Sequence, residues 1–297
     1  MTDLVSERPG PMPFRLLLDE AIRQARRHFR ALYPSVAIPL AVVTTLMAAA
    51  QALWFSSMVR SFGSPRQPIW APQVYLLALV NFALLIVAVM ALQVGAIDAL
   101  SGRPIAMKRA WRFAARGRVL FTLFVSYVLS IAALFCCCFP VLFVGPVLAL
   151  VPPIMAEEER FGFAAVNRSF ELATYDSGKG LFERPFMKVL LLLIVGVLLS
   201  YVLGLLVALP FQIPMWIDMF RKAAAGKDMV QGMTSWLWLQ VPAQFLNALV
   251  SSAVYLYMSF GIALLYFDTR GRKEGTDLHS EIEEVFPPAP PPGDLPL

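Results

Sequence analysis

Long apolar runs dominate this sequence of 297 residues. The run from 189 to 209 holds no charged side chain, and its length of about 20 residues is what an α-helix needs to cross the hydrocarbon core of a bilayer. Only 15% of all residues are charged, whereas soluble domains have about 25%. A transmembrane β-barrel would show short alternating segments instead. The sequence therefore predicts an all-α polytopic membrane protein.

The apolar runs predict six transmembrane helices, arranged as three hairpins. The predicted spans are about 36–57, 74–100, 119–139, 141–154, 187–209 and 244–267. They form one membrane domain over residues 14–278, between a proline-bearing start at 1–13 and an acidic, proline-rich tail at 279–297, which are both predicted to be disordered. No signal-peptide pattern precedes the first span, so we expect that span to act as its own insertion signal. Residues 210–235 are predicted to form a loop, with room for an interfacial helix anchored by Trp216, Met219 and Phe220.

An amphipathic surface helix is predicted before each hairpin. Phe14–Leu32 carries an apolar stripe with five arginines beside it. In Ser101–Gly117 the apolar residues Met107, Ala110, Trp111 and Ala114 recur at helical spacing. In Glu157–Tyr175 the apolar face is predicted to hold Phe163, Val166, Phe170 and Ala173. Three copies of one unit, a surface helix followed by two spans, make an internal repeat.

The distribution of basic residues predicts the orientation. Twenty of the 25 lysines and arginines lie on the side that holds both termini, and the other side holds Arg60, Arg66, Arg221, Lys222 and Lys227. Because cytoplasmic loops are enriched in Lys and Arg, both termini are expected in the cytoplasm of a bacterium, with the chain in its inner membrane. Basic amphipathic helices there favour anionic lipids as partners. They also leave room for a protein partner, and the apolar stripes argue against nucleic acid.

No sequence signature of catalysis is present. The chain lacks the metalloprotease, serine-hydrolase and phosphate-loop motifs. Its two histidines, His28 and His279, lie far apart in the sequence. The three cysteines are consecutive, Cys136 to Cys138, and adjacent cysteines rarely bridge. We therefore expect no enzyme activity, no cofactor and no metal site.

Polar residues within the spans are the other candidates for function. Asn81, Gln93 and Asp98 lie in span two, and Gln51 and Asn247 in spans one and six. They could line a transport path or join helices by hydrogen bonds. Asp98 could also pair with Arg103 or a neighbouring arginine. Pro146 interrupts the short span four, and interrupted helices free backbone groups that can bind a substrate.

Two stretches resemble a family of bacterial six-span membrane proteins. The first runs from Val151-Pro-Pro-Ile-Met-Ala-Glu157 through Arg168-Ser169 to Leu172. The second is Tyr266-Phe-Asp268-Thr-Arg270-Gly-Arg272-Lys-Glu274-Gly275-Thr-Asp277-Leu278. Both are similar to the membrane domain found beside glycerophosphoryl diester phosphodiesterases and to its uncharacterised relatives. The resemblance implies a six-span fold and a location in the inner membrane, and it does not imply a catalytic activity.

Charged residues of these two motifs are the candidate interaction site. Glu157 and Glu158 follow span four immediately, and Arg168 lies about three turns further along the surface helix. Asp268, Arg270 and Arg272 follow span six immediately, and Glu274 belongs to the same motif. We expect the tail to dock under the bundle, with Arg270 or Arg272 pairing Glu157 or Glu158, and Asp268 near Arg168 or the Arg109 helix. The function favoured is organisation of lipid or partner proteins through the cytoplasmic surface helices. The alternative is a transporter with a mid-membrane site near the broken span four.

Overall fold

The computed structural model describes residues 12–60, 72–135, 138–175, 184–225 and 229–285. All regular secondary structure in these ranges is helical. The helices are α2 (Phe14–Arg60), α3 (Pro72–Leu100), α4 (Met107–Ala114), α5 (Gly117–Phe135), α6 (Cys138–Ala149), α7 (Val151–Glu157), α8 (Phe163–Ala173), α9 (Pro185–Ala224) and α10 (Met229–Val285). The all-α prediction is confirmed, and Cys136 and Cys137 lie outside the described residues.

Four helices are long and apolar enough to cross a membrane, namely α2, α3, α9 and α10. A fifth candidate is the pair α4 and α5, which meet at an angle of 63°. Residues Leu142–Glu157 form a shorter apolar stretch. The chain is therefore a polytopic membrane protein, although six spans in three hairpins are not shown.

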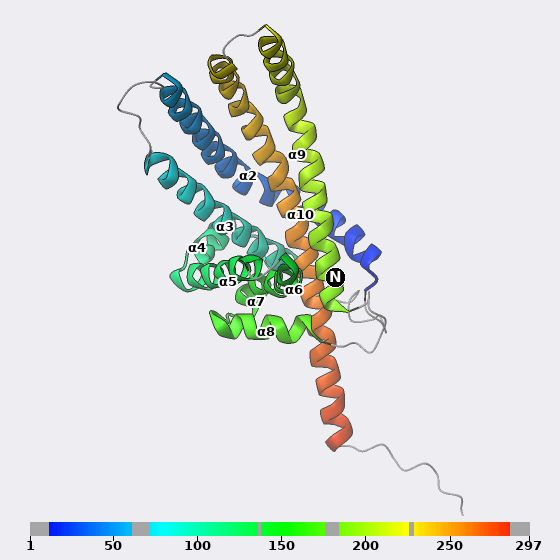
Figure 1. Ribbon diagram of the computed structural model, residues 1–297. Coiled ribbons are helices and arrows are strands. Elements are labelled where there is room, and N and C mark those ends of the chain that lie inside the picture. Colours follow the sequence, from blue (N-terminus) through cyan, green and yellow to red (C-terminus); the bar gives the residue numbers. More distant parts are fainter. Residues whose placement is uncertain (1–11, 61–71, 136–137, 176–183, 226–228, 286–297) are drawn as a thin grey trace, which may run out of the picture.

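The bundle is built around α10. This helix contacts α2, α9 and α3, and 56% of its apolar window is buried inside the protein, compared with 17% for α3 and α9. Figure 1 shows the four long helices diverging toward one end, while α4 to α8 gather beside the other end. The buried core lies at that second end, where Leu17, Ile97, Ile154 and Phe260 are almost fully enclosed.

The predicted separation between the first surface helix and span one is wrong, because both belong to the single helix α2. Pro34 and Pro39 lie inside this helix and not at its start. The stripe of Leu17, Ala21, Ala25, Leu32, Val36 and Leu40 is buried along it. This stripe continues across both prolines and packs in the core with α10, so tertiary contacts stabilise the helix where proline removes hydrogen bonds.

The region predicted as a loop at 210–235 is mostly helical: Trp216, Met219 and Phe220 do lie in a helix, but this helix is the continuation of α9 and not a separate interfacial one. Helix α9 continues through Pro210 and Pro214 to Ala224, and α10 begins at Met229, well before the predicted start of span six. In hydrocarbon, a break in the helix would leave several backbone groups unsatisfied, whereas each proline removes one donor. At its other end α10 runs to Val285, beyond the expected start of the tail at 279.

Span four is divided, but at a different place from that predicted. Helix α6 ends at Ala149 and α7 begins at Val151, with Leu150 between them. Pro152 and Pro153 occupy the first turn of α7, where a missing N–H costs little. Pro146 lies buried inside α6. The double proline, and not Pro146, therefore marks the break.

Helices α4 and α8 lie inside two of the predicted surface stretches. On α4 the expected faces are present, since Ala110 and Ala114 are buried and Lys108, Arg109 and Arg112 are exposed. On α8 the predicted apolar face is only partly right, because Phe163 and Phe170 are 70% and 56% exposed. The face that packs instead holds Ala165, Ser169, Leu172 and Ala173. Small residues allow close approach there, and the Ser169 hydroxyl donates to the Val147 carbonyl of α6.

Candidate functional site

A charged cluster joins three segments at the core end of the bundle. It consists of Glu158 after α7, Arg168 on α8, and Tyr266, Arg270 and Glu274 on α10. The Arg168 guanidinium lies 3.2 Å from Glu158 Oε2 and 3.2 Å from Glu274 Oε1. The Tyr266 hydroxyl donates to Glu158 Oε1 at 2.9 Å. The cluster therefore ties α7 and α8 to the central helix.

Local structure explains why these side chains meet. Tyr266, Arg270 and Glu274 are spaced four residues apart, so they lie along one face of α10. The link from α7 to α8 reverses direction through two left-handed residues, Glu159 with φ 53° and Gly162 with φ 64°. Such a conformation is uncommon for a residue other than glycine. This reversal brings Arg168 back over Glu158.

Direct pairing of Arg270 or Arg272 with Glu157 or Glu158 was expected, and the structure shows different partners. Arg270 Nε donates to Glu274 at 2.8 Å. Its Nη1 donates to the Tyr266 hydroxyl at 3.2 Å, so Arg270 is connected to Glu158 through Tyr266, and also through Glu274 and Arg168, with no direct bond described. The bond between Arg168 and Glu274 joins a residue that follows span four to one that follows span six.

Asp268 has other partners than the expected Arg168 or Arg109. Its carboxylate accepts a hydrogen bond from Arg272 Nε at 3.0 Å and lies 3.8 Å from Lys188 Nζ on α9. The Lys188 ammonium also donates to the Met12 carbonyl at 2.7 Å. Asp268 and Lys188 are 5% and 3% exposed. This buried pair links α9, α10 and Met12, which lies two residues before α2.

A third group of charges connects α3 with α7. Arg103 Nε lies 3.5 Å from Asp98 Oδ1, and the same guanidinium bonds Glu157. Asp98 lies in the last turn of α3 and is only 3% exposed. The interpretation of Asp98 as a partner of Arg103 therefore agrees with the geometry. Asp98 Oδ2 and Arg103 Nε are nevertheless buried without a hydrogen bond of good geometry.

These contacts shift the pKa values of Arg168 and of Glu171, which lies beside Arg168 on α8. Burial opposes the charge of Arg168, but the Glu158 and Glu171 carboxylates outweigh it, so the pKa of the guanidinium is raised. Burial likewise tends to raise the pKa of Glu171, yet hydrogen bonds from Arg168 and Lys273 lower it overall. Both groups are thus held in their charged forms at neutral pH.

These three groups of charges bond helices to one another. Each carboxylate named in them has a basic or phenolic partner. Within the described part of the chain, no group of three or more His, Cys, Asp or Glu side chains is placed to hold a metal. The arrangement stabilises the packing of α7 to α10 and offers no activated nucleophile.

The intramembrane candidates are not brought together. Asn81 accepts a hydrogen bond from the Thr44 hydroxyl of α2 at 3.2 Å, which joins two helices. Gln93 is 2% exposed, and its Nε2 has no partner. Neither of two described cavities is lined by Asn81, Gln93, Asp98 or Pro146.

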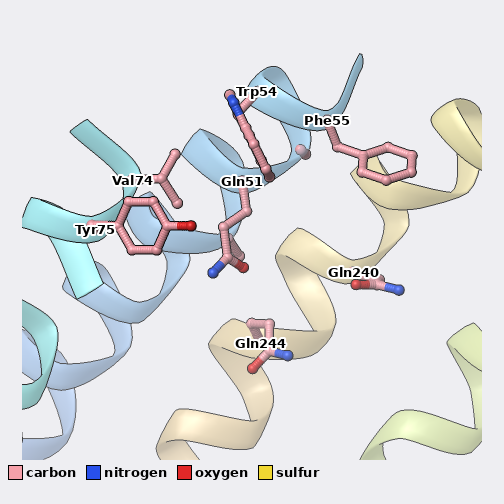
Figure 2. Close-up of a pocket in the computed structure, with 9 residues that line it drawn as sticks. Gln51, Trp54, Phe55, Val74, Tyr75, Gln240 and Gln244 are labelled. Carbon is pink, nitrogen blue, oxygen red and sulfur yellow. The ribbon is translucent and has the colours of Figure 1, made fainter. Parts of the chain in front are cut away.

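A second polar region lies at the opposite, diverging end of the bundle. Gln51 of α2 and Gln240 and Gln244 of α10 line a cavity of about 270 Å³. Figure 2 shows Gln51, Tyr75 and Gln244 directed toward the space between α2, α3 and α10. Gln51 was among the polar candidates predicted from the sequence, whereas Gln240 and Gln244 were not. The spacing of Gln240, Gln244 and Asn247, at i, i+4 and i+7, was a signal for a polar helix face.

No family model, no curated protein and no solved structure matches this chain.

Proposed function

We propose that this chain is a non-catalytic protein of the bacterial inner membrane that gathers anionic lipid, and through it partner proteins, at its cytoplasmic face. The observation that carries the proposal is a basic surface on α4 and the start of α5. It comprises Lys108, Arg109, Arg112, Arg116 and Arg118, which are all exposed. No aspartate or glutamate occurs between residues 99 and 156.

The basic surface has a fixed position relative to the membrane helices. Helix α4 packs against α3 through its other face, where Ala110, Phe113 and Ala114 are buried. Arg103, the remaining basic residue of this stretch, is engaged by Asp98 and Glu157. The nearby carboxylates of Asp98 and Glu157 are therefore paired with Arg103, which leaves the five exposed basic side chains available to an anionic ligand. Charges at the end of a span lie at headgroup depth, where lipid phosphates bind them.

Neutralising part of the basic surface should weaken lipid binding. Each basic residue near an anionic surface contributes about 1 kcal/mol. The variant with Lys108→Gln, Arg109→Gln and Arg112→Gln should therefore bind phosphatidylglycerol about a hundredfold more weakly. Native mass spectrometry of the full chain, titrated with phosphatidylglycerol or phosphatidylcholine, measures this. Arg221→Gln with Lys222→Gln, at the far end of α9, serves as the control and should bind normally. Wild-type binding by the triple variant would refute the proposal.

We also propose six spans with both termini cytoplasmic. In support, Figure 1 shows the ends of α2 and α9 and the starts of α3 and α10 at one end of the bundle, with α4 to α8 at the other. Helices α5 and the pair α6 and α7 would supply the two further spans, and α5 has 19 residues, enough for a bilayer of about 30 Å. The resemblance to the six-span family supports the same layout.

Reporter fusions test this topology. Fusions after Gly63 and Gly226 should report the periplasmic side, and fusions after Gly117, Gly180 and Gly275 the cytoplasm. Gly63, Gly180 and Gly226 lie outside the described residues, so the fusions supply information that the structure does not. A periplasmic signal at Gly117 would overturn the six-span arrangement, because the basic surface would then lie on the wrong side.

A further inference from the structure

The cavity at the diverging end of the bundle is lined by amides and aromatic rings. We call it the amide cavity, and it lies, partly open, between α2, α3 and α10. Three primary amides line it, from Gln51, Gln240 and Gln244, together with the aromatic rings of Trp54, Phe55 and Tyr75. None of the described residues that line it is charged. Gln51 and Gln240 are exposed and Gln244 is half-buried, so their donors and acceptors can reach a ligand that enters the cavity.

These amides are not explained by bonds between helices. No hydrogen bond described for this structure joins Gln51 with Gln240 or Gln244, whereas Asn81 and Thr44 deeper in the bundle do form such a bond. The three amides therefore keep donors and acceptors that a ligand in the cavity could bond.

The chemistry of the lining selects the ligand. A primary amide offers two donors and one acceptor and carries no charge, so three amides suit hydroxyl groups, which also donate and accept. Ions would find no countercharge here, and an acyl chain would leave the amides unsatisfied. The aromatic rings provide apolar surfaces for the C–H faces of a ring-shaped ligand. These properties together fit a neutral sugar.

Size and continuity agree with a group of headgroup size. The amide cavity has a volume of about 270 Å³, close to the lower limit of about 300 Å³ for small-molecule pockets. A smaller cavity of about 110 Å³ lies between α9 and α10, and it shares Gln240 and Gln244 with the first. Gln212 and Asn247 add two further amides there. Amides thus surround this end of α10 on two sides.

We propose that the amide cavity binds a neutral, hydroxyl-rich sugar group, presented as the headgroup of a membrane lipid or free in solution. In this assignment Gln51 and Gln244 hydrogen-bond the hydroxyls, and the rings of Trp54 and Tyr75 form walls of the site. The site lies at the end of the bundle opposite the basic surface, so it does not depend on the proposed binding of anionic lipid.

The test uses the full chain, purified in a polyoxyethylene detergent that contains no sugar. The probes are a monoglucosyl diacylglycerol, the same diacylglycerol without glucose, and free glucose as competitor, with native mass spectrometry as the readout. We expect the glucolipid to bind saturably and the sugar-free lipid to bind at least about tenfold more weakly, because the sugar supplies the hydrogen bonds. Competition by glucose would identify the free sugar as a ligand, and its absence would identify the lipid.

Variants distinguish the amide cavity from other sites. Gln51→Leu and Gln244→Leu should each weaken glucolipid binding about tenfold, since each removes hydrogen bonds to the sugar. Trp54→Leu removes an aromatic wall of the cavity, so it should weaken binding several-fold, and it also serves if a glutamine variant does not fold. Gln212 lines only the smaller cavity, so Gln212→Leu is the control. Equal binding of the sugar-free lipid, or wild-type affinity in all three cavity variants, would overturn the proposal.

Discussion

Replacing Arg168 with glutamine is expected to lower the free energy of unfolding by about 3 kcal/mol, since removal of one partner strands a buried charge. Arg168 is 12% exposed and its partner Glu158 is 8% exposed. Without the guanidinium, Glu158 keeps the Tyr266 hydroxyl but loses its most enclosed countercharge. Titration of the purified protein with a denaturing detergent in mixed micelles measures the change.

Arg160 provides a matched control for this prediction. It lies 3.2 Å from the same Glu158 oxygen but is 52% exposed, so Arg160→Gln should change stability by less than about 1 kcal/mol. The double variant Glu158→Gln with Arg168→Gln should lose less than the two single variants together, because no unpaired charge remains. If Arg160→Gln destabilises as much as Arg168→Gln, burial of the charged cluster is not what stabilises this end of the bundle.

The second large effect is expected at the pair formed by Lys188 and Asp268. Lys188→Met should lower the free energy of unfolding by about 3–5 kcal/mol, because it leaves the Asp268 carboxylate buried with less compensation. The two side chains are 3% and 5% exposed. Adding Asp268→Leu to Lys188→Met should recover most of the loss, since two apolar side chains of similar volume replace the pair. Thermal unfolding of the purified chain reports both steps.

The same helix offers the control for Lys188. Lys222 lies 2.6 Å from Asp218 on α9 and is 32% exposed, so Lys222→Met should cost less than about 1 kcal/mol. A double variant at Lys188 and Asp268 that is no more stable than Lys188→Met alone would contradict the explanation by an unpaired buried charge. The hydrogen bond from Lys188 to Met12 would then be the main contribution.

Several helices could be predicted because their causes are local. Span two was placed at 74–100, and α3 covers Pro72–Leu100, since an apolar run of that length needs a lipid environment whatever surrounds it. Helix α4 followed from the recurrence of apolar residues at helical spacing and from its basic opposite face. These patterns are properties of short stretches of sequence, so neighbouring helices could not change them.

Helix ends at proline could not be predicted in the same way. Pro34, Pro39, Pro210 and Pro214 lie within helices, whereas Pro152 and Pro153 begin one. The difference depends on what packs beside each proline. The buried stripe of α2 continues along α10 past Pro34 and Pro39. At Leu150 the chain turns instead, so the two prolines stand in the first turn of α7.

For the candidate site, hydropathy indicates at which end of the bundle the charged residues lie, whereas the packing of the helices sets which of them bond. Glu158 and Arg270 follow spans directly, and Arg168 lies on the short helix that comes next after Glu158, so the apolar pattern alone places all three at one end of the bundle. Which of them bond depends on the left-handed turn at Glu159 and on the rotation of α10, which directs Tyr266 and not Arg270 at Glu158. The position of a residue relative to lipid and water follows from its own transfer free energy, whereas this cluster forms only if three separate segments bring their charged groups within about 4 Å of one another.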